Sequence, residues 1–331
     1  MCDVNKNKNV YLSILLLIIY SLNGCKGSGS ASKDKSSAEA LETKPSLISE
    51  DFKNIDPNLP YFVSVSDNTP KDKKWVMVDS LSDEFDSWDS GKWRNSTWNY
   101  QVPVFMVESG NSGVENGKLW IEATLNESNP DGRWFQSARI HSNAKISYPM
   151  YTEASIKTSH ISGFNTYWLN NGNGRNRDEI DIIENNSNPS CCKPEFPTQM
   201  NSQYFHANSE LEPKVIRNNG KFSRNDLSEA NPLKYKGWNE AYHTYGVWWK
   251  DERNIQFYLD GEPAGGVKVG EHREGSYYAD RFFTRDLEII FDLWTADEDY
   301  IGGLAKKTDL QNDSINTMRV DWVRTWKLES K

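Results

Sequence analysis

The sequence predicts an all-β fold, a β-sandwich of jelly-roll type with a concave cleft. Short runs of alternating or aromatic-rich residues recur along most of the chain, and long stretches with helical periodicity are scarce. Turn signals such as Asn116-Gly117 and Asp260-Gly261 separate the runs, as they do in antiparallel hairpins. Many short strands and polar turns in one large unit are typical of such a sandwich. The predicted strands comprise residues 75–78, 118–123, 152–157, 164–169, 179–184, 242–250, 255–259, 287–291 and 318–328.

The composition limits the classes of partner. The chain has 331 residues, of which 37% are hydrophobic, and this is enough for one sizeable core. Its formal net charge is -9, and it has no clustered basic segment of the kind that binds nucleic acid. We therefore expect no nucleic-acid partner.

The first 25 residues are typical of an export signal. Lys6 and Lys8 precede an apolar segment, residues 10–22, which is too short for a comfortable membrane span. The segment ends in Leu22-Asn23-Gly24-Cys25, which resembles the lipobox of bacterial lipoproteins, whose cysteine is lipidated and becomes the mature N-terminus. The resemblance implies a lipid anchor at Cys25 and a place at the outer membrane or cell surface. An ordinary signal peptide with an incidental cysteine is the alternative.

Residues 26–72 are predicted to form a flexible linker, and residues 73–331 the folded domain. The linker segment is rich in Ser, Lys, Glu, Asp and Pro and has few large apolar residues, so it cannot bury enough surface to offset its ordering entropy. After the predicted cleavage, only Cys191 and Cys192 remain as possible disulfide partners. A bridge between neighbours needs a strained geometry, so we expect neither a disulfide nor a zinc site there.

Three acidic residues interrupt an apolar strand, Glu179-Ile180-Asp181-Ile182-Ile183-Glu184. Side chains alternate between the two faces of a strand, so Glu179 and Asp181 share one face and Ile180 and Ile182 the other. Strict alternation would direct Glu184 into the core, where an ionised carboxylate costs several kcal/mol. A β-bulge at residues 182–183 would return Glu184 to the side of the other acids. We therefore predict three carboxylates on the floor of one substrate cleft.

Packed carboxylates of this kind suit hydrolysis of a glycosidic bond. A retaining glycosidase needs a nucleophile and an acid/base catalyst about 5 to 5.5 Å apart. We assign Glu179 as nucleophile, Glu184 as acid/base catalyst, and Asp181 as the group that orients the nucleophile and raises the pKa of a neighbour by like-charge repulsion. The alternative is a solvated strand face whose acids only aid solubility.

The acidic strand also resembles the signature of glycoside hydrolase family 16 in its bulged form, which has one extra residue. Further segments agree with that family in the same order: Ser82-Asp83-Glu84-Phe85 with Trp93, and residues 242–249, 257–261 and 320–324. The resemblance implies a β-jelly-roll, retaining endo-hydrolysis of β-linked glucans or galactans, and the roles assigned above to Glu179, Asp181 and Glu184.

Within that family, the Tyr167-Trp168-Leu169 strand before the bulged motif is similar to agarases and porphyranases. The resemblance predicts a β-agarase that cleaves internal β-1,4 bonds of agarose. We expect the protein to be a monomer. Residues 170–177 depart from the usual agarase pattern, because they form a longer connection with two arginines. A β-porphyranase acting on sulfated agar, a β-1,3-glucanase and a non-catalytic polysaccharide-binding jelly roll remain alternatives. The last gains nothing from packed like charges.

Several other residues are candidates for binding a sugar chain. Forked guanidinium groups could hold a sulfate or hydroxyls, at Arg133, Arg139, Arg175 and Arg177. Flat indole faces could pack on pyranose rings, at Trp134, Trp168 and Trp294. His206 could lie close to the acid/base glutamate, with a structural histidine as the alternative. Of the adjacent Trp248 and Trp249, only one can enter the core.

No cofactor is expected for the reaction itself. The family resemblance suggests a structural calcium, with Glu84 and Asp321 as candidate ligands. The sequence contains no contiguous calcium-binding loop.

Overall fold

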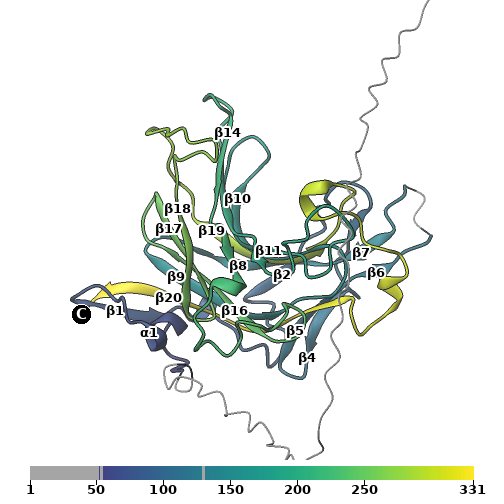
Figure 1. Cartoon of the computed structure of the whole chain (residues 1–331), viewed down its shortest axis with the longest axis horizontal. Helices are drawn as coiled ribbons and strands as arrows, with labels where there is room; N and C mark the ends of the chain where they lie inside the picture. Colours follow the sequence, from purple (N-terminus) through teal and green to yellow (C-terminus); the bar gives the residue numbers. More distant parts are fainter. Residues whose placement is uncertain (1–51, 53–54, 129–130) are drawn as a thin grey trace, which may run out of the picture. The chain divides into compact units, whose positions relative to one another are not determined.

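Two antiparallel sheets, stacked face to face, contain most of the strands in the computed structural model (Figure 1). The structure describes residue 52 and residues 55–128 and 131–331. We call the first sheet the cleft sheet. Its seven strands follow the order β14 (Val215–Asn219), β13 (Gln203–Ala207), β11 (Arg177–Asn185), β10 (Phe164–Gly172), β19 (Leu287–Trp294), β8 (Arg139–Ile146) and β2 (Trp93–Asn95).

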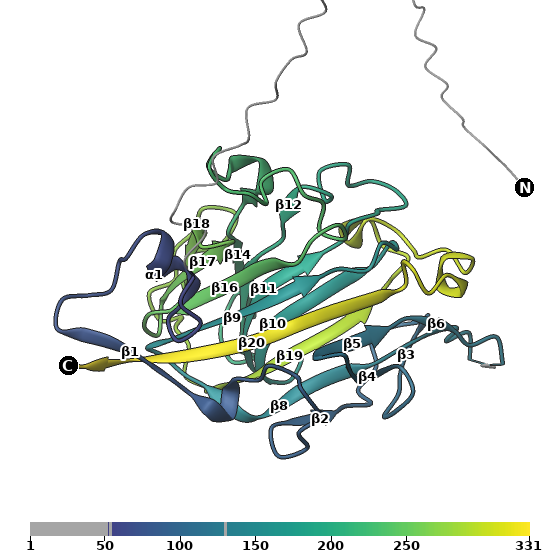
Figure 2. The ribbon, with the colours of Figure 1, turned by 90° about the horizontal axis from the view of Figure 1, so that it is seen from below.

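The second sheet, which we call the back sheet, has eight strands. Its order is β18 (Glu262–Lys268), β17 (Asn254–Leu259), β16 (His243–Trp249), β9 (Met150–Lys157), β20 (Thr317–Ser330), β5 (Lys118–Glu122) and β4 (Ser112–Glu115), while β1 (Lys73–Met77) also pairs with β20. The long strand β20 runs beside β9 across this sheet (Figure 2). The predicted all-β sandwich is therefore confirmed.

Small elements complete the described part of the chain. β12 (Gln199–Met200) pairs with β15 (Phe222–Ser223), and β3 (Val104–Met106), β7 (Phe135–Ser137) and β6 (Thr124–Leu125) form a three-stranded sheet. The helical elements of residues 55–128 and 131–331 are α1 (Tyr61–Val65) and the 3-10 turns η2 (Asp79–Leu81), η3 (Arg224–Asp226), η4 (Asp299–Ile301) and η5 (Asp309–Gln311).

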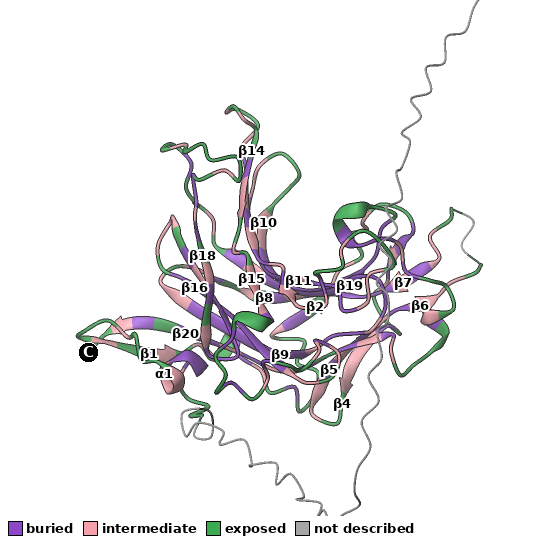
Figure 3. Ribbon diagram, viewed as in Figure 1, coloured by how far each residue is buried: buried purple, intermediate pink, exposed green. Residues whose placement is uncertain are grey.

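The main core lies between the two sheets and follows from side-chain alternation. Tyr167 of β10 stacks on Phe291 of β19, with ring centroids 4.9 Å apart. Trp249 of β16 is fully buried in this core, whereas Trp248 belongs to a second cluster, as alternation predicts. Buried residues follow the strands of both sheets, and exposed residues gather in the loops (Figure 3).

The folded domain begins before the predicted boundary at residue 73. Residues 58–66, which we call the strap, include α1 and pack on the outer face of the back sheet. Phe62 is fully buried among Trp75, Tyr151, Trp248 and Tyr258. The linker prediction fails here because it rested on the average composition of residues 26–72. A few apolar side chains are enough to hold a segment in place where a complementary apolar surface already exists.

The prediction for the two cysteines is also wrong, because Cys191 and Cys192 form a disulfide. Side chains of adjacent extended residues point apart. Cys192 instead has a left-handed backbone, with φ of 65°, which brings the two sulfur atoms to one side. The disulfide loop is fastened to the chain after η4 by a hydrogen bond of 3.0 Å from the Cys191 amide to the Gly302 carbonyl.

The export signal and Cys25 lie outside the described residues, so both stay predictions. Within the described part of the chain, no helix combines the length and apolar character required to cross a membrane.

Candidate active site

The predicted bulge is present in the strand that carries the acids. In the ladder between β10 and β11, Tyr167 lies opposite Ile183 and Trp168 lies opposite Asp181, so Ile182 is the extra residue. Ile182 and Ile183 are both fully buried in the core. After the bulge, alternation places Glu184 on the face of Glu179 and Asp181, and all three acids line one cleft.

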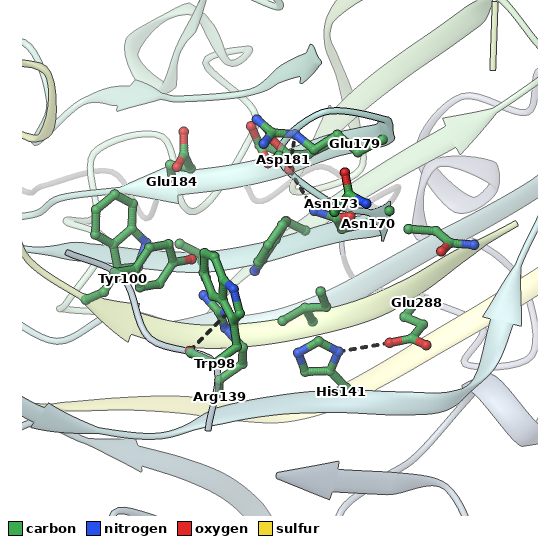
Figure 4. A pocket seen from close by; sticks show the side chains of 18 residues that line it. Trp98, Tyr100, Arg139, His141, Asn170, Asn173, Glu179, Asp181, Glu184 and Glu288 are labelled. Carbon is green, nitrogen blue, oxygen red and sulfur yellow. Dashed lines mark hydrogen bonds and ion pairs between the residues drawn. The ribbon is translucent and has the colours of Figure 1, made fainter. Parts of the chain in front are cut away.

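Strand register arranges the residues on the cleft side of the sheet in three rows, because directly paired residues of neighbouring strands share a face. The first row is Glu184, Thr166, Asp292 and Arg139; the second is Asp181, Trp168, Ile290 and His141; the third is Glu179, Asn170 and Glu288. The cleft has a volume of about 570 Å³ and extends from the acidic strand β11 over β10, β19 and β8 (Figure 4). Trp98, Tyr100 and the hairpin residues 171–174 also line the cleft.

Glu179 is held by two donors. The Asn170 amide donates to Glu179 Oε2 over 2.8 Å, and Arg177 Nη2 donates to Glu179 Oε1 over 3.4 Å. Burial raises the pKa of Glu179, and the positive charges of Arg177 and Arg139 and the Asn170 bond oppose that rise. Among the three acids, Glu179 therefore has the contacts that best stabilise a negative charge.

Glu184 is placed to keep its proton. Burial, and then the negative charge of Glu179, raise the pKa of Glu184 to about 8, although the Gln203 amide donates to its Oε2 over 2.6 Å. Burial and the charges of Glu184 and Glu179 likewise raise the pKa of Asp181 well above its usual value. The three acids therefore cannot all be ionised near neutral pH.

The cleft has an aromatic rim, formed by Trp98 and Tyr100. The Tyr100 ring stacks on Trp294 with centroids 4.1 Å apart. The Arg139 guanidinium lies 4.4 Å from the ring centroids of both Trp98 and Tyr100. Trp98 retains 60% of its surface exposed, so a broad indole face is open to a ligand. Neither residue was predicted to bind a sugar chain, although the aromatic pair in Trp98-Asn99-Tyr100 could have indicated such a role.

Four of the predicted binding residues line the cleft: Arg139, Trp168, Arg177 and Trp294. Arg133 and Trp134 do not. Arg133 Nη1 donates to the carbonyls of Tyr100 (2.9 Å) and Val104, so it supports the rim from behind. Lys307 Nζ lies 5.2 Å from the centroid of the Trp134 ring. Arg175 is also absent from the lining, at the turn of the hairpin between β10 and β11.

His206 does not lie in the cleft, and that prediction is wrong. It is paired in the ladder with Asp178, the neighbour of Glu179, and therefore occupies the opposite face of the sheet. His206 Nδ1 is 2.7 Å from Asp178 Oδ1, and both side chains are buried. This pair joins β13 to the beginning of β11 and has a structural role.

Asn170, His141 and Glu288 are cleft residues that the sequence analysis did not identify. His141 Nδ1 lies 2.9 Å from Glu288 Oε2, and Arg94 Nη2 lies 2.6 Å from the same oxygen. These residues come from different strands and carry no local motif, so only the register of the sheet brings them together.

The residues predicted to hold calcium do not fit that role. Glu84 accepts bonds of 2.7 and 2.8 Å from Arg324, and Asp321 is paired with Lys118. Each carboxylate already has a cationic partner. Within residues 52, 55–128 and 131–331, the one group of three or more possible metal ligands is Cys191, Cys192 and Asp299. Its sulfur atoms are joined in the disulfide, so they cannot act as thiolate ligands.

Curated relatives are identical to this chain at about a quarter of the aligned positions. β-Agarase AgaB34 of Agarivorans albus is 26% identical over 274 residues, which cover 77% of this chain and 57% of that protein. β-Porphyranase E of Zobellia galactanivorans is 27% identical over 270 residues, covering 78% of this chain and 90% of the relative. The chain thus spans little more than half of the first relative and most of the second.

Solved structures share the fold. β-Agarase A in complex with oligoagarose superposes with a TM-score of 0.63 at 20% identity, covering 80% of this chain and 96% of that one. The β-porphyranase BpGH16B of the human gut bacterium Bacteroides plebeius superposes with a TM-score of 0.62 at 24% identity, covering 87% and 99%.

The family comparison covers nearly the whole folded domain. The model described as "Beta-porphyranase A-D, GH16 domain" matches residues 75–328, and this range includes the bulged strand and its three acids. The chain therefore belongs to glycoside hydrolase family 16, in its agarase and porphyranase branch, and is a glycoside hydrolase.

Proposed function

We propose that this chain is a retaining endo-hydrolase that cleaves internal β-1,4 bonds of a red-algal galactan of the agar type, with agarose as the first candidate. The observation that carries the proposal is the bulge at Ile182, which puts Glu184 beside Glu179 and Asp181 in an open-sided cleft. The curated relatives named as β-agarases and β-porphyranases support the substrate class.

In the proposed reaction, Glu184 donates its proton to the glycosidic oxygen while Glu179 attacks the anomeric carbon. The bond to the leaving sugar breaks, and a covalent glycosyl-enzyme forms. Glu184, now ionised, then takes a proton from a water molecule, and that water releases the sugar from Glu179 with net retention. Asn170 and Arg177 orient the Glu179 carboxylate, and Gln203 orients Glu184. Asp181 lies between the two and disfavours a second charge nearby.

The pH dependence follows from these two carboxyl groups. Glu184 must carry a proton, and since its pKa is about 8, activity should fall as the pH rises through about 8. Glu179 must be ionised, and since its pKa is raised, activity should already fall on the acidic side at a pH above the usual range of a glutamate. Measured as kcat/KM at constant ionic strength, the profile should be a bell; a rate that stays constant beyond about pH 9 would contradict Glu184 as the general acid.

Porphyran is the second candidate substrate. The matching family model describes porphyranases, and the hairpin at residues 170–177 bears Arg175 and Arg177, whose guanidinium groups suit a sulfate ester.

Digestion of agarose, porphyran, carrageenan and laminarin in parallel tests the proposal. We expect a ladder of neutral oligosaccharides from agarose, each with a newly formed β-anomeric reducing end in early NMR spectra. Sulfated products from porphyran alone would favour the second candidate. Products from laminarin alone, or first-formed α-anomers, would contradict the proposed substrate class or the retaining mechanism.

A further inference from the structure

A fourth carboxylate, Asp292, lies fully buried in the row of the acid/base glutamate, and the reaction described above does not use it. It stands on β19, whose residues Glu288, Ile290 and Trp294 line the cleft, whereas Asp292 itself does not. A buried charge costs much free energy unless it is paired and hydrogen-bonded, so its contacts show what it does there.

Asp292 is bonded on both oxygens. Arg139 Nε donates to Oδ2 over 2.7 Å, and the Tyr100 hydroxyl donates to the same atom over 3.0 Å. The Thr166 hydroxyl donates to Oδ1. Asp292 therefore connects three neighbours: a cleft cation on β8, the aromatic rim, and the residue directly beside Glu184 in the ladder.

The contacts with Arg139 and Tyr100 shape the aromatic rim of the cleft. Arg139 is 2% exposed, lies 4.4 Å from the ring centroids of Trp98 and Tyr100, and has one nitrogen, Nη2, that is buried with no partner among the described residues. An unpaired buried donor is unfavourable, so this nitrogen is suited to a ligand oxygen. Since Asp292 holds the other side of the guanidinium, it determines where that donor lies.

The same carboxylate lies close enough to influence Glu184. β11 and β19 are separated by β10 alone, so two strand spacings, about 10 Å, lie between the backbones of Glu184 and Asp292. Other charged or titratable groups also act on Glu184: Glu179 and Asp181 on its own strand, Arg217 on β14, Tyr100 at the rim, and Tyr300 of η4. Unlike Glu179 and Asp181, Asp292 is a carboxylate on a different strand, β19.

We propose that Asp292 is a positioning residue of the active site, which fixes Arg139 and Tyr100 at the rim and keeps Glu184 in its proton-bearing form. The proposal deepens the function proposed above and rests on the assignment of Glu184 as general acid. Asp292 is ion-paired with Arg139, and a carboxylate in this row opposes ionisation of Glu184. Without Asp292, the Arg139 cation would be left unopposed in the same row and would favour the Glu184 anion.

Direct titration of Glu184 in the free full-length protein tests this without any substrate. The side-chain carboxyl carbon is followed by ¹³C NMR in protein labelled at glutamate, and its signal is assigned with Glu184→Gln. In Asp292→Asn we expect the midpoint to fall by about one pH unit, the shift that one charge at about 10 Å produces at an effective dielectric constant of about 20. An unchanged midpoint overturns the proposal.

Glu288→Gln is the matched control, because it removes a carboxylate from the same strand and the same cleft. Glu288 is paired with Arg94 and His141 and lies in a different row, so the Glu184 midpoint should move by less than about 0.3 pH unit. Equal shifts in the two variants would mean that any lost cleft carboxylate has this effect, and would refute a specific role of Asp292.

A second variant covers the case in which Asp292→Asn does not fold. Arg139→Gln removes the other half of the pair, and the midpoint of Glu184 should then rise; an unmoved midpoint again refutes the proposal. Because these titrations need no turnover, the two proposals fail separately. A shifted midpoint in a protein that cleaves no galactan would leave the role of Asp292 intact and reject the substrate. Galactan hydrolysis with unchanged Glu184 midpoints would support the proposed substrate and refute the proposed role of Asp292.

Discussion

Glu179→Gln and Glu184→Gln are each expected to lose roughly 10⁴-fold or more in kcat/KM on polysaccharide, which corresponds to about 5 kcal/mol of transition-state stabilisation. An amide at position 179 cannot form the glycosyl-enzyme, and an amide at position 184 cannot protonate the leaving oxygen. Release of reducing ends measures the loss. Both side chains are close in shape to the originals, so the melting temperature should change little.

The two variants should differ on a substrate whose leaving group needs no proton, such as a glycosyl fluoride. Glu184→Gln should then still form the intermediate, whereas Glu179→Gln should remain inactive. Glu115→Gln, the same replacement at an exposed position on β4, is the control and should behave as the unaltered protein. Appreciable polysaccharide hydrolysis by either active-site variant would reject the assignment of roles.

Phe62→Ala should reduce the free energy of unfolding by about 3–5 kcal/mol, the usual cost of truncating a fully buried aromatic ring. Phe62 has no exposed surface and stacks on Tyr258, with ring centroids 4.6 Å apart. Denaturant titration measures the change in free energy. The melting temperature should fall by roughly 10 °C. Since the strap lies on the back sheet, kcat/KM of the folded variant should stay within about twofold.

The control for this variant is Ile55→Ala, just upstream of the strap, where 43% of the isoleucine is exposed. Its stability should change by less than about 0.5 kcal/mol. If Phe62→Ala were equally neutral, the strap would not be an integral part of the domain, and the original boundary near residue 73 would stand.

The local pattern of the chain was sufficient to predict the sandwich and the bulged strand. Alternation along residues 179–184 leaves Glu184 in the core unless one residue is extra, and the cost of burying a charge predicts the irregularity. The structure has that irregularity at Ile182. The same alternation correctly separated Trp248 from Trp249.

Predictions for single residues outside a motif were less successful. Arg133 and His206 were predicted to bind the sugar chain, yet Arg133 supports the rim from behind and His206 lies on the other face of the sheet. Trp98 and Tyr100 occupy a connection between strands, where no periodicity indicates direction. The adjacent disulfide depends on one left-handed residue, Cys192, which composition does not reveal.

The sequence by itself determined the fold class and the identity of the three acids, because both depend on a repeat of two along single strands. Which residues face those acids was decided only by tertiary structure. Four other strands supply these residues, which are Asn170, Asp292, Arg139 and Gln203. Sheet order and register bring them to the same part of the sheet as Glu179 and Glu184. Pairing between distant strands depends on packing of the whole sandwich, and so no local pattern contains it.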